Sequence, residues 1–247
     1  MLGLPDDIKV LLFDLDGVLT QTAKVHAAAW KKMFDAYLKD RAEQGGEPFR
    51  EFTQEDYEKF VDGRPRFDGV RSFLGSRGIE LPEGDPDDPP GAETIAGLGN
   101  RKNELVLKVM AEDGVEAYPG TVRYLDAVRE QGGLRTAVVS ASANAEQALE
   151  AAGIADRFEA RVDGKTIAEH GLKGKPAPDT FLEGAKLLGV EPAQAAVFED
   201  ALAGVQAGRA GNFGFVVGVN RGDDAQRRGL KEHGADVVVD DVSELLA

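Results

Sequence analysis

Several apolar runs in the chain lack the alternation of polar and apolar residues that marks a strand with one exposed face. They lie at residues 8–13, 134–140, 195–200, 213–219 and 236–240. Such runs predict strands that are buried on both faces, as in a parallel sheet. Helices predicted at 144–152 and 201–210 separate some of these strands. This order is typical of an α/β domain with right-handed crossover connections.

Residues 40–117 have a different pattern. They contain segments with helical periodicity and no convincing buried strand, and a helix with an apolar stripe is predicted directly after Thr22. The first strand precedes this block and the other strands follow it. We therefore predict an α/β fold with a Rossmann-like parallel sheet core and an inserted helical cap domain. The predicted boundaries are 1–22 and 116–247 for the core and 23–115 for the cap.

The charge of the chain limits its partners. It carries 44 acidic and 29 basic residues, a formal net charge of −15. A field of this sign repels nucleic acid and anionic lipid, so we expect neither as a partner. It also repels a phosphorylated substrate. If the substrate is an anion, the site must supply positive charge locally, as a metal ion, lysines or arginines.

Cysteine is absent, which excludes disulfides, thiolate catalysis and cysteine-bound zinc. This composition fits a reducing cytoplasm. The N-terminal residues lack a basic segment followed by an apolar core and so do not predict a signal peptide. No run of about 18 apolar residues predicts a membrane span. We expect a cytoplasmic protein that has no membrane partner and is a monomer.

Polar residues follow three of the predicted strands at the point where each strand ends. Asp14 and Asp16 follow the first, Ser140 ends the second, and Glu199 and Asp200 end the third. Ligands bind at the carboxyl ends of the strands in open parallel sheets. If these strands are neighbours, the carboxylates repel one another unless a cation lies between them. A small number of hard oxygen ligands suits Mg²⁺, which also binds phosphate oxygens.

Lys175 precedes Pro-Ala-Pro and is expected in extended or turn structure, where its charge could face a phosphate or Asp14. Each element taken singly has a simpler interpretation. Asp-x-Asp occurs in turns, Ser140 could cap a helix, Lys175 could lie on the surface, and Glu199-Asp200 could open a helix. The occurrence of all four elements in this order favours a phosphoryl-transfer site.

This combination resembles the haloacid dehalogenase superfamily of phosphotransferases, through the segment Asp14–Thr20 (DLDGVLT), Ser140, Lys175 and Glu199-Asp200. The resemblance implies that Asp14 is the nucleophile and Asp16 the general acid and base. It also implies that Ser140 and Lys175 hold the transferring phosphoryl group. Mg²⁺ would be held by Asp14, the backbone carbonyl of Asp16 and Asp200, with Glu199 close by.

Within this superfamily the chain resembles the β-phosphoglucomutase group. The resemblance implies that Arg66, Ser142 and Asn144 hold a second, non-transferring phosphate of a small sugar phosphate. It also implies that Thr22 and His26 lie at the substrate site, with His26 near Asp16. The residues that carry it are Thr22, His26 and Trp30, Gly63-Arg64-Pro65-Arg66, Arg101-Lys102-Asn103, Ser140–Asn144 and Lys175–Asp179.

Two activities share these residues. A mutase would interconvert β-glucose 1-phosphate and glucose 6-phosphate through a bisphosphate, whereas a phosphatase would let water attack the aspartyl phosphate. Arg66, Ser142 and Asn144 favour the mutase, which we expect. Ala143 and Asp62 replace lysines that are typical of the mutases, and they favour the phosphatase. A non-catalytic partner module is a third interpretation, and the intact Asp-x-Asp pair argues against it.

Overall fold

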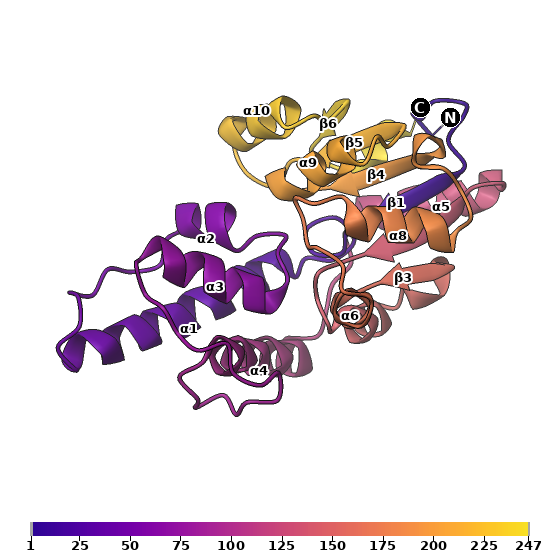
Figure 1. Ribbon diagram of the computed structural model, residues 1–247. Coiled ribbons are helices and arrows are strands. Elements are labelled where there is room, and N and C mark those ends of the chain that lie inside the picture. The colour runs from indigo at the N-terminus through magenta and orange to yellow at the C-terminus, as the bar shows by residue number, and fades with distance from the viewer. Residues whose placement is uncertain (1, 247) are drawn as a thin grey trace. The chain divides into compact units, whose positions relative to one another are not determined.

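The computed structural model describes residues 2–246, which form two compact units (Figure 1). The first, here called the α/β unit, runs up to Thr22 and resumes at Val115. The second, the helical unit, spans Ala23–Gly114 and enters the chain after the first strand. The predicted fold class is confirmed, because the α/β unit is built on a parallel sheet.

The sheet of the α/β unit has the strand order β3-β2-β1-β4-β5-β6 among the described residues, and all neighbours are parallel. Every residue of β1 is buried, as its unbroken apolar run predicts. The strand order reverses between β1 and β4, which is where an open α/β sheet binds its ligands. The strands are β1 (Val10–Phe13), β2 (Arg135–Val139), β3 (Ala160–Val162), β4 (Ala195–Glu199), β5 (Phe215–Val219) and β6 (Val237–Val239).

The sequence pattern did not predict β3. This strand has three residues, and its central residue is Arg161, so it forms no apolar run. The Arg161 guanidinium pairs with Asp163 at 2.9 Å and with Glu146 at 3.0 Å. An edge strand that is short and carries a paired charge is typical of sheets that resist edge-to-edge association.

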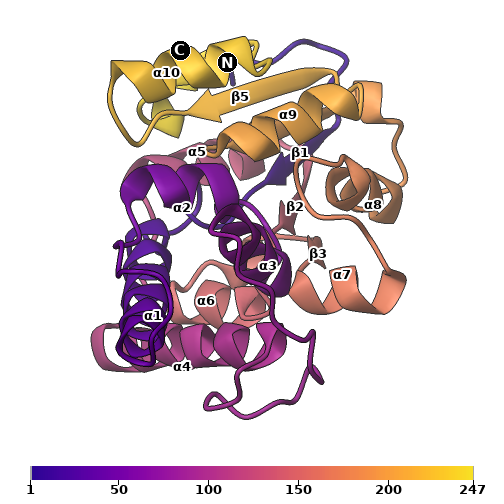
Figure 2. The same ribbon diagram turned by 60° about the vertical axis from the view of Figure 1, so that its left-hand side comes forward.

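Helices cover both faces of the sheet (Figure 2). Leu12 and Val197 face α8 and α9, and on the opposite face the ring of Tyr124 from α5 lies 5.6 Å from the ring of Phe198. The helices of this unit are α5 (Pro119–Gln131), α6 (Ala145–Ala151), α7 (Gly164–His170), α8 (Asp179–Leu187), α9 (Leu202–Ala210) and α10 (Asp224–Glu232), with short 3₁₀ helices at Ala155–Arg157, Pro192–Gln194 and Val242–Leu245.

The helical unit has an aromatic core. The Phe34 ring lies 4.3 Å from the Phe73 ring and 5.2 Å from the Trp30 ring, between centroids. The apolar stripe predicted after Thr22 is confirmed, because its residues on α1 are buried. The helices of this unit are α1 (Ala23–Glu43), α2 (Gln54–Phe60), α3 (Arg66–Ser76) and α4 (Ile95–Asp113).

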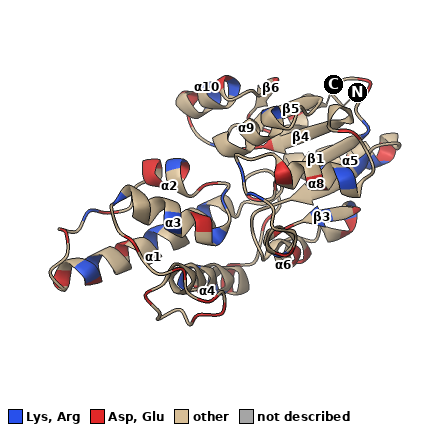
Figure 3. Ribbon diagram, in the orientation of Figure 1, with Lys and Arg blue, Asp and Glu red and all other residues tan. Residues whose placement is uncertain are grey.

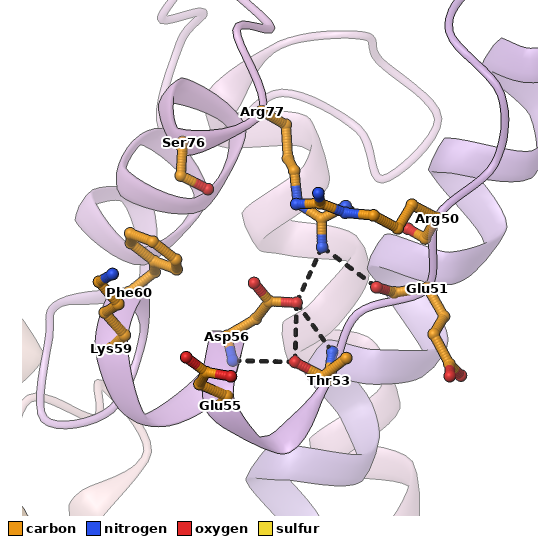
Figure 4. A pocket seen from close by; sticks show the side chains of 9 residues that line it. All are labelled: Arg50, Glu51, Thr53, Glu55, Asp56, Lys59, Phe60, Ser76 and Arg77. Carbon is orange, nitrogen blue, oxygen red and sulfur yellow. Dashed lines mark hydrogen bonds and ion pairs between the residues drawn. The ribbon is translucent and has the colours of Figure 1, made fainter.

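An open pocket of about 530 Å³ lies on the surface of the helical unit, near the start of α2 (Figure 4). Thr53 caps α2 by accepting a hydrogen bond from the backbone N–H of Asp56. Arg77 donates to the Asp56 carboxylate at 2.8 Å and to the Glu51 carbonyl at 3.1 Å. None of the site residues predicted from the sequence lines this pocket, so we assign it a structural role.

Charged residues lie mainly on helices and loops, and both signs occur along α1 and α10 (Figure 3). Strand β1 carries none. Over residues 2–246, no helix combines the length and the apolar character that a membrane crossing requires.

Candidate active site

The end of β1 places Asp14 at the centre of the sheet edge. Phe13 pairs with Val138 of β2 and with Phe198 of β4, and the backbone N–H of Asp14 donates to the Phe198 carbonyl at 2.9 Å. The residue after Phe198 is Glu199, so parallel register brings the two carboxylate-bearing residues side by side. The positions at which β1 and β4 end therefore agree with the site predicted from the sequence.

A tight loop follows Asp14. The backbone N–H groups of Leu19 and Thr20 both donate to the Leu15 carbonyl at 2.9 Å, and Gly17 N–H donates to the Thr20 carbonyl at 2.8 Å. Gly17 has φ +90°, a conformation that side-chain-bearing residues rarely adopt. These bonds fold residues 14–20 back on themselves and hold Asp16 close to Asp14. We call residues 14–20 the catalytic loop.

Lys175 bridges two carboxylates. Its Nζ atom donates to Asp14 Oδ1 at 2.5 Å and to Glu199 Oε1 at 2.6 Å, and all three residues are buried. The other Glu199 oxygen accepts from the backbone N–H of Ala201 at 2.7 Å. Each Glu199 oxygen thus accepts one hydrogen bond from a protein donor, and the carboxylate holds Lys175 in place.

The pKa values in this cluster depend on burial and on the excess of carboxylates over the single lysine. Burial raises the pKa of Asp14 well above its usual range, Lys175 opposes the rise, and Glu199 and Asp16 add to it. Burial by itself would lower the pKa of Lys175, but Asp14 and Glu199 outweigh it and raise that pKa, so the lysine stays protonated. A further cation beside Asp14 would favour its ionised, nucleophilic form.

Asp16 is held by threonine hydroxyls. Thr22 Oγ1 donates a short hydrogen bond to Asp16 Oδ1 and lies 2.7 Å from Thr20 Oγ1. Thr20 Oγ1 contacts the Leu15 carbonyl at 3.2 Å, which ties the chain of hydroxyls to the catalytic loop. Thr22 directly precedes α1, as the sequence predicted, and its hydroxyl is directed to Asp16.

Asp200 lies against the catalytic loop. A methyl group built on Gly17 would overlap the Asp200 carboxylate, so the absence of a side chain at Gly17 lets the carboxylate approach. Asp14, Asp200 and the backbone carbonyl of Asp16 offer hard oxygens, which is the donor set that Mg²⁺ prefers. Among residues 2–246 no group of three or more acidic or histidine side chains is placed to hold a metal. The expected set consists of two carboxylates and one backbone carbonyl, and the chemistry of these donors suits Mg²⁺.

Ser140, Ser142 and Asn144 form two successive turns after β2. Ser140 Oγ accepts from the Ser142 N–H at 3.1 Å, and Ser142 Oγ accepts from the Asn144 N–H at 3.2 Å. Asn144 precedes α6 without a side-chain bond to the helix end. Ser140 is buried beside the sheet, where its N–H donates to the Val162 carbonyl. The alternative interpretation, in which Ser140 caps the following helix, is not what the structure shows, because its hydroxyl accepts from Ser142 N–H ahead of α6.

The other predicted residues, His26 and Arg66, belong to the helical unit. Lys102 Nζ lies 2.8 Å from His26 Nδ1 and 4.9 Å from the centre of the Trp30 ring. A protonated lysine can only donate, so His26 Nδ1 accepts and the proton of the neutral imidazole lies on Nε2. Arg66 begins α3, lies over the Phe67 ring at 4.9 Å, and has a pKa lowered by burial.

The structure brings Asp14, Lys175 and Glu199 into one bonded cluster. Asp16 lies in the catalytic loop, and Asp200 lies against that loop. Sequence reasoning assigned no role to Lys102, although this lysine is buried on the apolar side of α4. A lysine where the helical period expects an apolar residue was the signal available for it. Nothing in the local sequence pointed to Arg221, which contacts the catalytic loop.

Comparisons with known proteins agree with this geometry. The family model of haloacid dehalogenase-like hydrolases matches residues 8–212. The chain is 58% identical to a β-phosphoglucomutase of Mycobacterium tuberculosis, over 100% of this chain and 94% of that protein. It is 33% identical to a fructose-1-phosphate phosphatase of Escherichia coli, over 83% of this chain and 94% of that protein.

A crystal structure of a β-phosphoglucomutase from Clostridium difficile has a TM-score of 0.74 and 28% identity, and the match covers 96% of this chain and 93% of that chain. A match of this coverage includes parts of both the α/β unit and the helical unit. The sequence match and the fold match thus extend over nearly the whole chain. We conclude that the chain belongs to the haloacid dehalogenase-like hydrolase family and, within it, to the β-phosphoglucomutase-like group.

Proposed function

We propose that this chain is a β-phosphoglucomutase, which converts β-glucose 1-phosphate to glucose 6-phosphate through a bisphosphate intermediate. One observation carries the proposal. The buried cluster in which Lys175 holds Asp14 against Glu199 lies in a chain that is 58% identical, over its whole length, to a protein of that name. A buried carboxylate held by a buried lysine is arranged for reaction with an anionic group.

In the proposed reaction, an oxygen of Asp14 attacks the phosphorus of the sugar phosphate, and the bond from phosphorus to the leaving oxygen breaks. Asp16 donates a proton to that leaving oxygen and later removes one from the hydroxyl that attacks the aspartyl phosphate. The Thr22 hydroxyl orients the Asp16 carboxylate for both transfers. Lys175 reduces the repulsion between the Asp14 carboxylate and the phosphoryl oxygens.

Asp14, the backbone carbonyl of Asp16, and Asp200 would hold Mg²⁺. When bound, the ion supplies positive charge that offsets the charge of the phosphoryl group and of the carboxylates. This matches the requirement, set by the net charge of −15, for local positive charge at the site. Ser140 is the proposed hydroxyl donor to the transferring phosphoryl group, because it is buried where β2 ends.

Substrate recognition is part of the same proposal. We assign the second phosphate to Arg66, Ser142 and Asn144, and we assign His26 a part in positioning Asp16 during the reaction. The engagement of His26 by Lys102 keeps one imidazole tautomer and supports a defined role for that ring. The residues 23–115 would act as the cap. We also propose that the protein is cytoplasmic and that it is a monomer. Size-exclusion chromatography of the purified protein tests the monomeric state.

A sugar-phosphate phosphatase is the second candidate. Ala143 and Asp62 stand where the mutases typically have lysines, and the similarity to a fructose-1-phosphate phosphatase of Escherichia coli extends over 83% of this chain. In that reaction water, instead of a sugar hydroxyl, would attack the aspartyl phosphate. Loss of lysines at the second-phosphate position would shorten the time that the bisphosphate stays bound.

One assay separates the two candidates. The protein is incubated with Mg²⁺, β-glucose 1-phosphate and a trace of glucose 1,6-bisphosphate, and glucose 6-phosphate and free phosphate are followed together. Asp14→Asn serves as the blank. The mutase predicts glucose 6-phosphate without phosphate release. Free phosphate without isomerisation would replace the mutase by the phosphatase, and inactivity of the wild type toward these and other small phosphate esters would refute both.

A further inference from the structure

Arg221 contacts the catalytic loop from a distant part of the chain. It follows β5, precedes α10, and donates from Nε to the Gly17 carbonyl at 2.5 Å. Its Nη1 donates to the Asp240 carbonyl at 2.9 Å. One guanidinium therefore joins the catalytic loop to the segment that follows β6. A charged donor makes stronger hydrogen bonds than a neutral one, and the planar fork fixes the direction of both.

An aromatic ring supports the guanidinium. The Cζ atom of Arg221 lies 3.6 Å from the centre of the Tyr118 ring, which is the stacking that arginine favours. The backbone N–H of Tyr118 donates to the Leu19 carbonyl at 3.0 Å. The backbone of the residue whose ring supports Arg221 is thus bonded to the catalytic loop, so both contacts hold the same segment.

A second path leads from Arg221 to Asp200. The Arg221 backbone N–H donates to Gln226 Oε1 at 2.9 Å, and Gln226 Nε2 donates to the Asp200 carbonyl at 3.2 Å. The Asp200 carboxylate in turn packs against Gly17, whose carbonyl Arg221 holds. Arg221 and Gln226 therefore set the separation between Asp200 and the loop that carries Asp16.

We propose that Arg221 is a positioning residue. Together with Gln226 it fixes the Gly17 and Asp200 backbones so that Asp14, Asp16 and Asp200 present their oxygens to one Mg²⁺. The inference rests on the proposed function for its metal. Groups that orient metal ligands typically change metal affinity or activity by about 10–100-fold when they are removed.

The test compares two arginines of the same region. Arg221→Lys keeps the charge and removes the fork and the stacking. Arg227→Lys is the matched control, because Arg227 bonds the Val238 carbonyl and the Asp240 carboxylate, both near β6. Mg²⁺ affinity is measured by isothermal titration calorimetry without substrate, and kcat and KM are measured separately.

For Arg221→Lys we expect Mg²⁺ affinity and kcat to fall by roughly 10–100-fold, with KM for the sugar phosphate little changed. Arg227→Lys should match the wild type in all three quantities. Wild-type Mg²⁺ affinity in Arg221→Lys, or an equal loss in Arg227→Lys, would overturn the proposal, as would a wild type that binds no Mg²⁺.

Gln226→Met keeps the proposal testable if Arg221→Lys does not fold. It removes the bonds to the Arg221 N–H and the Asp200 carbonyl and keeps the side-chain length. Weaker Mg²⁺ binding supports the proposal, and unchanged binding overturns it. Failure of the proposed function can be told apart from failure of this inference. A wild type that binds Mg²⁺ but isomerises no sugar phosphate refutes the mutase, and the calorimetry still decides the role of Arg221.

Discussion

Replacement of Lys175 by methionine removes the cation that lies between two buried carboxylates. Its Nζ atom contacts Asp14 at 2.5 Å and Glu199 at 2.6 Å, and the lysine side chain is 2% exposed. Loss of one partner of a buried ion pair destabilises a protein by about 3–5 kcal/mol, because the remaining charge stays buried without a counter-ion. We expect Lys175→Met to lower the free energy of unfolding by that amount at neutral pH and to abolish phosphoryl transfer.

The loss of stability should depend on pH with a defined sign. Burial raises the pKa of Asp14 above its unfolded value of about 3.8, and Lys175 opposes that rise. A carboxyl with a raised folded pKa contributes stability below its unfolded pKa, and this stability is lost as the pH rises through the folded pKa. Removing Lys175 raises the folded pKa further. The deficit of Lys175→Met should therefore be smallest in acid and should grow as the pH increases.

Urea unfolding followed by circular dichroism at several pH values measures this deficit. Lys186→Met is the matched control, because Lys186 also pairs with a carboxylate, Glu183, at 2.9 Å but is 75% exposed. Exposed pairs contribute less than about 1 kcal/mol, so the control should stay close to the wild type. Lys175→Met/Glu199→Gln should regain part of the lost stability. A deficit that is equal in the two single variants, or that does not change with pH, would refute this account of the cluster.

Three further predictions follow from local geometry. Gly17→Ala forces a side chain into φ +90° and against Asp200, so Tm should fall by about 2–8 °C and Mg²⁺ binding should weaken. Gly75→Ala is the control, because its added methyl meets nothing within 4 Å; its Tm and Mg²⁺ affinity should match those of the wild type. Thr22→Val removes a hydrogen bond to the Asp16 carboxylate, so kcat should fall by roughly 10–100-fold; an unchanged kcat would contradict the role of Thr22 on Asp16. Burial would raise the pKa of Asp56, but bonds from Thr53 and Arg77 outweigh it and lower that pKa. The stability that Asp56 contributes is then present above its unfolded pKa and is lost as the pH falls through the folded pKa. The difference in unfolding free energy between wild type and Asp56→Asn, measured by urea unfolding, should therefore vanish in acid. A difference that persists in acid would argue against the ion pair.

The sequence was sufficient to predict those parts of the fold and the candidate site that depend on local patterns. The run before Asp14 is apolar throughout, so a strand buried on both faces was the expected structure, and β1 has it. Asp14, Ser140 and Glu199 could be grouped because each ends a strand of one parallel sheet. Lys175 could be added because the proline that follows it excludes a helix interior.

The remaining features depend on contacts between residues far apart in the sequence. Arg221 and Gly17 are 204 positions apart, and Lys102 and His26 are 76 apart. No periodicity or turn signal relates such pairs. Strand β3 escaped prediction for a local reason, since three residues with a central arginine do not form an apolar run. The engagement of Glu199 by Lys175 and Ala201 also required the folded geometry, because the sequence shows only an acidic pair at a strand end.

The most direct test of the central claim is to locate the phosphoryl group on the protein. The protein is incubated with Mg²⁺ and glucose 1,6-bisphosphate labelled at both phosphates, quenched in acid, digested, and analysed by mass spectrometry. We predict a phosphoryl group on Asp14 in the wild type, and none in Asp14→Asn. A stable label on another residue, or labelling of Asp14→Asn equal to that of the wild type, would contradict the assignment of Asp14 as the nucleophile.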